Sequence, residues 1–238
     1  MYVFYLGRRR LRSIAFFLLV LLFVLGLGLS FTRAQLNPVP VMKIEPIYQG
    51  NPNIKAVALT FNIDWGQEYL PKIEEALASA GVKATFFITG RWAEQFPGMV
   101  KELALAGHEI GNHGFSHAHV DQLSLEDNKR EIERAEKILK ELTGIKPNLY
   151  TPPYGENKPH VVAAAAQLGY KTIMWTVNPG DWMPERNGAD IIRIVKQKAQ
   201  NGAVILLHPT EKTAEVLPEI IRLLKEEGYG FKTVTEIL

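Results

Sequence analysis

The sequence predicts an α/β fold in which a parallel sheet closes into a barrel or near-barrel. Short apolar runs alternate with longer helical patterns, and about seven such units follow one another toward the C-terminus. The chain has 238 residues, of which 47% are hydrophobic, so it can bury a substantial core.

The first segment is basic and then apolar. RRRLR is followed by IAFFLLVLLFVLGLGLSF, Ile14 to Phe31, which carries no charge. About 18 such residues are the minimum for a bilayer span, and the preceding arginines keep the N-terminus in the cytoplasm. We expect residues 1–34 to anchor a single-pass membrane protein whose C-terminal domain lies outside the cytoplasm. The alternative is a cleaved signal peptide and a secreted domain, because Thr32–Ala34 resemble a cleavage site.

Residues 35–53 contain four prolines and little periodicity, which predicts an extended spacer before a domain over 54–238. Five arginines precede Gln35, and without them the chain has 22 basic and 25 acidic residues. A nucleic-acid partner is therefore not expected. The chain has no cysteine, which excludes disulfides, a thiolate nucleophile and a thiolate zinc site.

Seven strands are predicted, at 56–61, 84–89, 108–113, 148–151, 171–177, 203–208 and 230–234. Helices are predicted between them, at 67–80, 91–106, 125–142, 158–168, 189–200 and 213–227. Ser124 and Asp127 have the spacing of a capping box and predict the start of the third helix.

Polar and aromatic residues gather where the predicted strands end, at 62–64, 113–117, 152–155, 178–182 and 208. In a barrel of this type the loops after the strands meet at one face and carry the chemistry. The turns at the other end, AGVK and TGIK, are plain. This asymmetry predicts a functional site at the carboxyl face.

HGFSH places His113 and His117 four residues apart, directly after a strand. Two imidazoles at that spacing can bind one cation, and Asp64 from a neighbouring strand end would complete a set of two histidines and a carboxylate. Surface or capping histidines are the alternative for this pair.

His208 follows a buried-looking run and could move a proton near neutral pH, or be a core histidine bonded to a carbonyl. Asp181 could orient His208 or cap a turn. TPPYG, at 151–155, is rigid enough to aim a backbone amide at an oxyanion, although a tight crossover has the same composition. Trp175 and Trp182 are candidates for stacking on a sugar or for the core.

Taken together, TFNIDWG, HGFSH, TPPYG, Asp181–Trp182 and LLHPT resemble the motifs of the polysaccharide deacetylases with a NodB homology domain, in the same order. EPIYQGNPN, WGQEYL and LLHPT resemble the bacterial sporulation-associated subgroup most. The resemblance covers the whole domain and implies a distorted (β/α)7 barrel that removes acetyl groups from cell-wall glycan with a divalent metal.

The resemblance implies roles for single residues. Asp64, His113 and His117 would hold the metal, zinc first and cobalt or manganese as alternatives. His208 would be the general acid with Asp181 beside it, and the backbone amide of Tyr154 would bind the oxyanion. The substrate would contact Pro153, Trp182 and Leu206. The protein is expected to be a monomer, bound to cell-wall polysaccharide and anchored in the membrane.

The chain departs from the family pattern at two linked positions. Asn62 stands where the family has an aspartate as general base, and Thr151 where it commonly has an arginine paired with that aspartate. A buried arginine without its carboxylate is unfavourable, so the two changes fit together. In addition, Asp64 lies one residue beyond the family's metal aspartate, and side chains of adjacent strand residues face opposite ways unless a bulge intervenes.

Two functions therefore compete. The first is a membrane-anchored, metal-dependent deacetylase, a hydrolase acting on carbon–nitrogen bonds other than peptide bonds, slowed by the missing base. The second is a barrel that binds glycan or a wall-assembly partner without turnover. Another hydrolytic chemistry is a third alternative.

Overall fold

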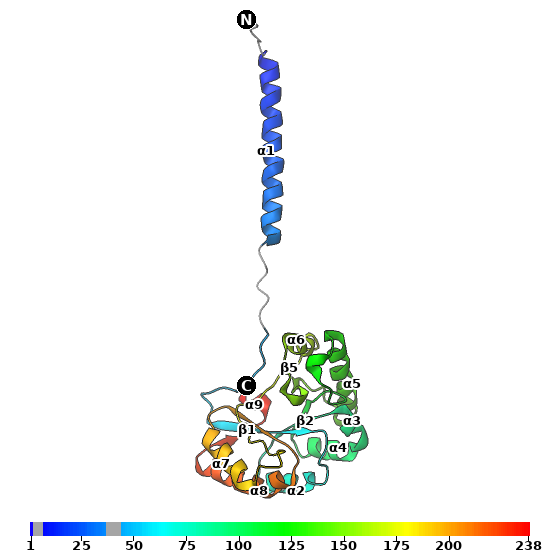
Figure 1. Cartoon of the computed structure of the whole chain (residues 1–238), viewed down its shortest axis with the longest axis vertical. Coiled ribbons are helices and arrows are strands. Elements are labelled where there is room, and N and C mark those ends of the chain that lie inside the picture. The colour runs from blue at the N-terminus through cyan, green and yellow to red at the C-terminus, as the bar shows by residue number, and fades with distance from the viewer. Residues whose placement is uncertain (2–6, 37–43) are drawn as a thin grey trace. The chain divides into compact units, whose positions relative to one another are not determined.

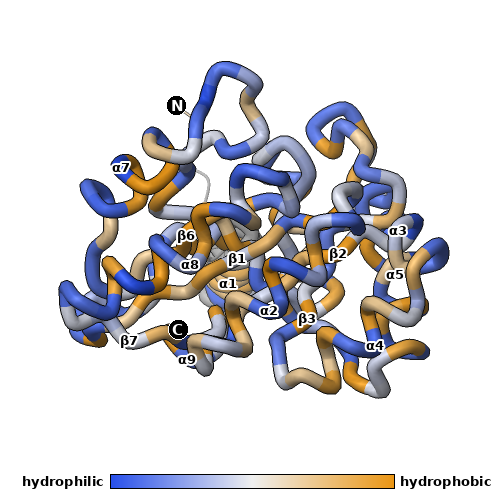
Figure 2. The backbone as a smooth tube through the Cα atoms, turned by 90° about the horizontal axis from the view of Figure 1, so that it is seen from below, coloured by the Kyte–Doolittle hydropathy of each residue, from blue (hydrophilic) through white to orange (hydrophobic). Residues whose placement is uncertain are grey.

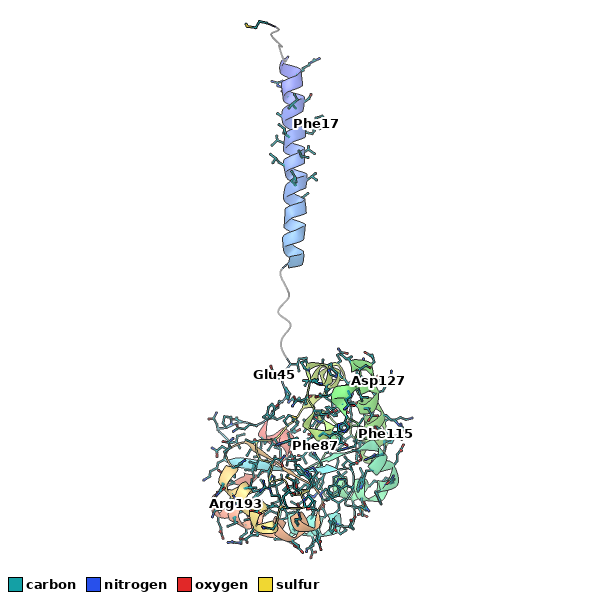
Figure 3. The ribbon with its side chains drawn as sticks, in the orientation of Figure 1. Phe17, Glu45, Phe87, Phe115, Asp127 and Arg193 are labelled. Atoms are coloured by element: carbon teal, nitrogen blue, oxygen red, sulfur yellow. The ribbon has the colours of Figure 1, made fainter. Side chains whose placement is uncertain are left out.

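A computed structural model of the chain describes residues 1, 7–36 and 44–238 (Figure 1). The chain divides into two compact units, Met1–Lys43 and Ile44–Leu238. The first holds one helix, α1 (Arg8–Leu36), whose apolar side chains from Ile14 to Leu27 are exposed, as Phe17 illustrates in Figure 3. Over the described residues, no helix combines the length and the apolar character needed to cross a membrane.

The second unit is built on a sheet of parallel strands with the order β5-β4-β3-β2-β1-β6, and β7 pairs with β1. The α/β class with its parallel sheet is thereby confirmed. The strands are β1 (Ala56–Ile63), β2 (Thr85–Ile88), β3 (Glu109–Asn112), β4 (Leu149–Tyr150), β5 (Lys171–Thr172), β6 (Ala203–Leu207) and β7 (Gly230–Phe231).

The sheet is a half-barrel rather than a regular closed barrel. Its edge strands, β5 and β6, are connected through single bridges instead of a continuous ladder of hydrogen bonds. Val177 bridges to Ile205 in β6, whereas Ile47 bridges to Ile173 just beyond β5 and Gln49 bridges to Ala203 in β6. We name residues 44–51 the N-terminal strap. This strap and the irregular stretch 173–177 occupy the gap between β5 and β6.

Helices pack on the outside of the sheet: α8 contacts α2 and α7, and α5 contacts α3, α4 and α6. Figure 2 shows hydrophobic stretches of β1 inside this domain. The helices are α2 (Leu70–Ala80), α3 (Gly90–Gln95), α4 (Pro97–Leu105), α5 (Leu125–Thr143), α6 (Pro159–Gln167), α7 (Gly188–Lys198), α8 (Glu211–Glu226) and α9 (Val234–Ile237), with 3-10 turns η1 (Val120–Gln122) and η2 (Pro153–Gly155).

Strand β1 is buried on both faces, and its residues alternate between two cores. Val57, Leu59, Phe61 and Ile63 belong to the core shared with the outer helices. Ala56 and Ala58 belong to the inner core, which α9 closes with Val234 and Ile237. Because side chains alternate along a strand, Asn62 lies on the same face as Ala56 and Ala58. The alternation therefore brings Asn62 to the inside of the half-barrel.

Several predicted boundaries differ from the structure. The helix predicted over 91–106 is two helices, because Pro97 begins α4 and Phe96 takes a non-helical conformation. The strand predicted over 171–177 ends at Thr172, and the one predicted over 230–234 ends at Phe231. Of the predicted spacer, residues 37–43 lie outside the described residues, whereas residues 44–53 belong to the compact unit.

Candidate functional site

A cavity of about 350 Å³ opens where the strands end at the carboxyl face of the sheet. It brings together residues that follow β1, β3, β4 and β6 and the irregular stretch after β5. Its lining residues are Asn62, Trp65, His113, His117, Tyr154, Gly155, Trp175, Asn178, Trp182, Leu206 and His208. The predicted convergence of strand ends on one site is present in the structure.

His208 and Asp181 form a hydrogen-bonded pair at one side of the cavity. Nδ1 of His208 donates to Asp181 over 3.0 Å, and the His208 backbone amide donates to the same carboxylate over 2.6 Å. Asp181 is fully buried and also accepts from the Thr213 hydroxyl at 2.7 Å. The pair fixes the tautomer of His208, so Nε2 is the nitrogen free for a ligand.

His113 and His117 also line the cavity, with ring centroids 5.1 Å apart. Nδ1 of buried His113 donates to the Thr151 carbonyl at 2.6 Å, which leaves Nε2 as its acceptor. Burial, followed by the neighbouring His117, lowers the pKa of His113 to about 3. Burial also lowers the pKa of His117. Both rings are therefore neutral at pH 7 and have the protonation state that a metal or a hydrogen-bond donor requires.

Two residues of the site have strained backbones. His117, with φ of 55°, and Tyr154, with φ of 58°, are the non-glycine residues with positive φ in the part of the chain that the structure describes. Their rings meet edge to face at 4.6 Å. Such conformations persist only where the surrounding contacts impose them, and they cluster at functional sites.

Glu131 of α5 holds the loop that carries His117. Its carboxylate accepts hydrogen bonds from the Phe115 amide at 3.1 Å, the Ser116 amide at 2.8 Å and the Ser116 hydroxyl at 2.9 Å. This contact was not predicted, because nothing in the sequence of an amphipathic helix marks one glutamate as an anchor for a distant loop.

Asp64 is turned toward Arg91 rather than lining the cavity. Its carboxylate accepts from Nε of Arg91 at 2.7 Å, from Nη2 of the same guanidinium, and from the Thr89 hydroxyl at 2.8 Å. Alternation along β1 buries Ile63 among the helices and by itself would return Asp64 to the inner face. The Asp64 side chain is instead held by its contacts with Thr89 and Arg91, which follow β2. Arg91, directly after β2, was missed although it follows a strand end.

Of the three residues predicted to bind a metal, His113 and His117 line the cavity and Asp64 does not. Within residues 1, 7–36 and 44–238, no three His, Cys, Asp or Glu side chains are arranged to hold a metal ion. His113 and His117 share the cavity, but every oxygen of Asp64 already accepts from Arg91 or Thr89. The residues present do not fit the metal site that the family resemblance implies.

Asn62 and Thr151 differ in how well their polar groups are satisfied. Thr151 donates its hydroxyl to the Ile173 carbonyl at 3.0 Å. The Oδ1 atom of Asn62 is buried without a hydrogen-bond partner, although the residue lines the cavity. Buried polar atoms are normally paired, so Asn62 is an unused hydrogen-bonding group facing the site.

Aromatic rings surround His208 at the mouth of the cavity. Trp65 lies parallel to the His208 ring with centroids 6.3 Å apart, and Trp182 meets it edge-on at 4.7 Å. Both tryptophans are 43% exposed and Tyr154 is 58% exposed. Trp65 was not among the predicted site residues, although its position next to Asp64 was a usable signal.

The remaining predicted residues fall in different places. Leu206 lines the cavity, and its contact with a substrate stays a prediction. Pro153 is buried in η2 and is absent from the lining. Asn178 lines the cavity and accepts from the Gly180 amide at 2.9 Å, which shapes the turn before Asp181. The oxyanion role of the Tyr154 amide stays a prediction.

Comparison with known proteins gives a consistent picture. The family model for polysaccharide deacetylase matches residues 49–173. The chain is 38% identical over 194 residues to the uncharacterized protein YlxY of Bacillus subtilis, covering 82% of this chain and 60% of YlxY. It is 32% identical to the peptidoglycan-N-acetylmuramic acid deacetylase PdaA of Bacillus subtilis, covering 86% of this chain and 79% of PdaA.

Among solved structures, BA3943 of Bacillus anthracis, a CE4 family pseudoenzyme, matches with a TM-score of 0.79 and 37% identity. The match covers 82% of this chain and 69% of BA3943. A mutant of BA3943 has restored enzymatic activity. The fold found here is also shared with the family 4 carbohydrate esterase PdaA of Bacillus subtilis, which matches with a TM-score of 0.77 and 30% identity over 83% of this chain and 86% of PdaA.

Proposed function

This chain belongs to the polysaccharide deacetylase family, and from that premise we propose that its cavity binds N-acetylated sugars of cell-wall glycan without efficient deacetylation. Deacetylases of the family are hydrolases of carbon–nitrogen bonds and are generally metal-dependent.

The proposal rests mainly on the side chain of Asn62. It stands at the position of the family's general base, and an amide cannot take a proton from water. Loss of a positioned base typically slows a reaction by about 10²- to 10⁴-fold. At the same time the unpartnered Oδ1 of Asn62 is a ready acceptor for the N–H of an acetamido group or for a sugar hydroxyl. The residue is therefore suited to recognition and unsuited to proton abstraction.

The rest of the cavity supports binding of an uncharged sugar. No Lys or Arg side chain is among the residues that line it. The half-exposed rings of Trp65, Trp182 and Tyr154 offer apolar faces at its mouth, and His208 and Asn178 offer polar groups. Ligand sites commonly combine apolar walls with a few fixed polar groups in this way.

The experiment measures binding and turnover on the same samples. The full chain is titrated with N-acetylglucosamine oligomers and with soluble peptidoglycan fragments, and tryptophan fluorescence and acetate release are followed. We expect saturable binding and no acetate above background. Fast acetate release by the wild type would overturn the proposal, and so would the absence of binding to either ligand.

A slow deacetylase is the second candidate, because the His208–Asp181 pair is kept in a form that could protonate a leaving amine. For this candidate we expect weak acetate release that rises with added zinc or cobalt, and a further increase in Asn62→Asp. No acetate from either protein under these conditions would exclude it.

We further propose that the domain works outside the cytoplasm and is delivered there by the N-terminal segment, as an anchor or a cleaved signal. The exposed apolar side chains of α1 support this. Fractionation of cells and N-terminal sequencing of the mature chain test it. A role in sporulation and a monomeric state rest on the family resemblance, and spore-cortex composition in a deletion strain and light scattering test them.

A further inference from the structure

The positions of three neighbouring strands place Arg91 between the parts of the predicted metal site. β2 lies between β1 and β3 in the sheet. Asp64 follows β1, Thr89 and Arg91 follow β2, and the loop with His113 and His117 follows β3. The segment that follows β2 therefore lies between the segment that carries Asp64 and the loop that carries the two imidazoles.

Backbone hydrogen bonds fix this arrangement on both sides. The Thr89 amide donates to the Ile63 carbonyl at 2.9 Å, which ties the end of β2 to the residue before Asp64. On the other side, the amides of Gly90 and Arg91 donate to the carbonyls of Gly114 and Phe115 at 2.9 and 3.0 Å. The first turn of α3 is thus bonded to the histidine loop through its backbone.

The side chain of Arg91 connects the first turn of α3 to Asp64. Its guanidinium binds both oxygens of Asp64 in a fork, the geometry that an arginine and a carboxylate adopt in their strongest pairs. The Asp64 side chain is 9% exposed, whereas that of Arg91 is 47% exposed. A carboxylate buried this deeply needs a cation, and Arg91 supplies it from within the chain.

From this geometry we infer that Arg91 takes the place of the divalent metal in this chain, and that the site is built to work without one. Asp64 keeps its charge partner, but the partner is an internal guanidinium instead of a metal ion. The histidines keep neutral nitrogens toward the cavity, where they can bond to a ligand. The inference goes beyond the proposed function, because it would hold whatever ligand the cavity takes.

The test is a titration of the full chain with Co²⁺, followed by the visible absorption of the bound ion and by metal content after dialysis. The wild type is compared with Arg91→Gln, which frees Asp64, and with Arg91→Lys, which keeps the positive charge. Arg193→Gln is the matched control, because Arg193 pairs with Asp190 in α7. Figure 3 labels Arg193 at the periphery of the domain. His117→Ala is added to Arg91→Gln to locate any site that forms.

We expect Arg91→Gln to bind Co²⁺ at least about tenfold more tightly than the wild type, and the added His117→Ala to remove that gain. Arg91→Lys and Arg193→Gln should behave as the wild type. The inference is overturned if the wild type binds Co²⁺ as tightly as Arg91→Gln does, or if Arg91→Gln gains nothing. The wild-type titration can overturn it even if a variant fails to fold. No glycan enters this experiment, so its failure is distinct from failure of the proposed function.

Discussion

Asp181 accepts two hydrogen bonds from His208, one from the backbone amide and one from the ring. A fully buried carboxylate therefore sets both the position of the chain after β6 and the orientation of the imidazole in the cavity. The same carboxylate binds Thr213 in the first turn of α8. One side chain thus joins the site to the helix that follows it.

Asp181→Asn should destabilise the fold by about 2–3 kcal/mol, because hydrogen bonds to a charged acceptor are lost and an amide donor is buried without an acceptor. Urea unfolding measures this. Asp190→Asn is the control on the surface of α7 and should leave the urea midpoint nearly unchanged. Equal changes in unfolding free energy for the two substitutions would contradict a stabilising role of the Asp181 hydrogen bonds.

Glu131→Gln should loosen the loop of His117, because three hydrogen bonds converge on one carboxylate oxygen. We expect faster hydrogen exchange at the amides of Phe115 and Ser116 and a loss of about 1–3 kcal/mol in stability. Glu133→Gln, on the exposed face of the same helix, should leave exchange at these amides as in the wild type. Unchanged exchange in Glu131→Gln would contradict the anchoring role.

Stability should fall as the pH drops below about 6.5, because the folded pKa of His113 lies near 3 and the unfolded chain binds the proton more readily. The unfolded state takes up more protons between these two values, so acid favours unfolding there. From pH 7 to pH 5 this single group should cost about 2 kcal/mol. Unfolding free energies of wild type and His113→Gln, measured at both pH values in EDTA, give the difference. Equal pH dependence in the two proteins would refute the prediction.

Trp182→Ala should weaken binding of N-acetylglucosamine oligomers by about tenfold, because a half-exposed aromatic face at the cavity mouth is lost. Calorimetric titration measures the affinity. Leu105→Ala removes an 87% exposed apolar side chain of α4 that does not line the cavity, and should bind as the wild type does. Full affinity in Trp182→Ala would mean that the sugar lies elsewhere.

The order of strands and helices could be predicted from the sequence because local periodicity determines it. The alternation of buried residues in β1 and the N-cap of α5, where Ser124 accepts from the Asp127 amide, are local features. Pro97 could also have placed the break between α3 and α4, because a proline disfavours helical conformation in the residue before it.

The details of the site depended on contacts between distant residues. Alternation along β1 does not decide whether Asp64 faces the cavity, because contacts with residues that follow β2 hold its side chain. Its partner Arg91 lies 27 positions away in sequence. The Asp181–His208 pairing was anticipated as one alternative, because both residues follow strands that end at the same face.

The N-terminal strap determines where a soluble fragment of this protein can begin. Its backbone fills the gap at the edges of β5 and β6: the Ile47 amide donates to Thr172, the Met174 amide donates to Ile47, and the Gly50 amide donates to Gly202. A shortened chain that begins at Ile54 would leave these edges unpaired. Unpaired edge strands recruit other chains, so such a fragment is expected to aggregate, and a soluble version should begin no later than Ile44.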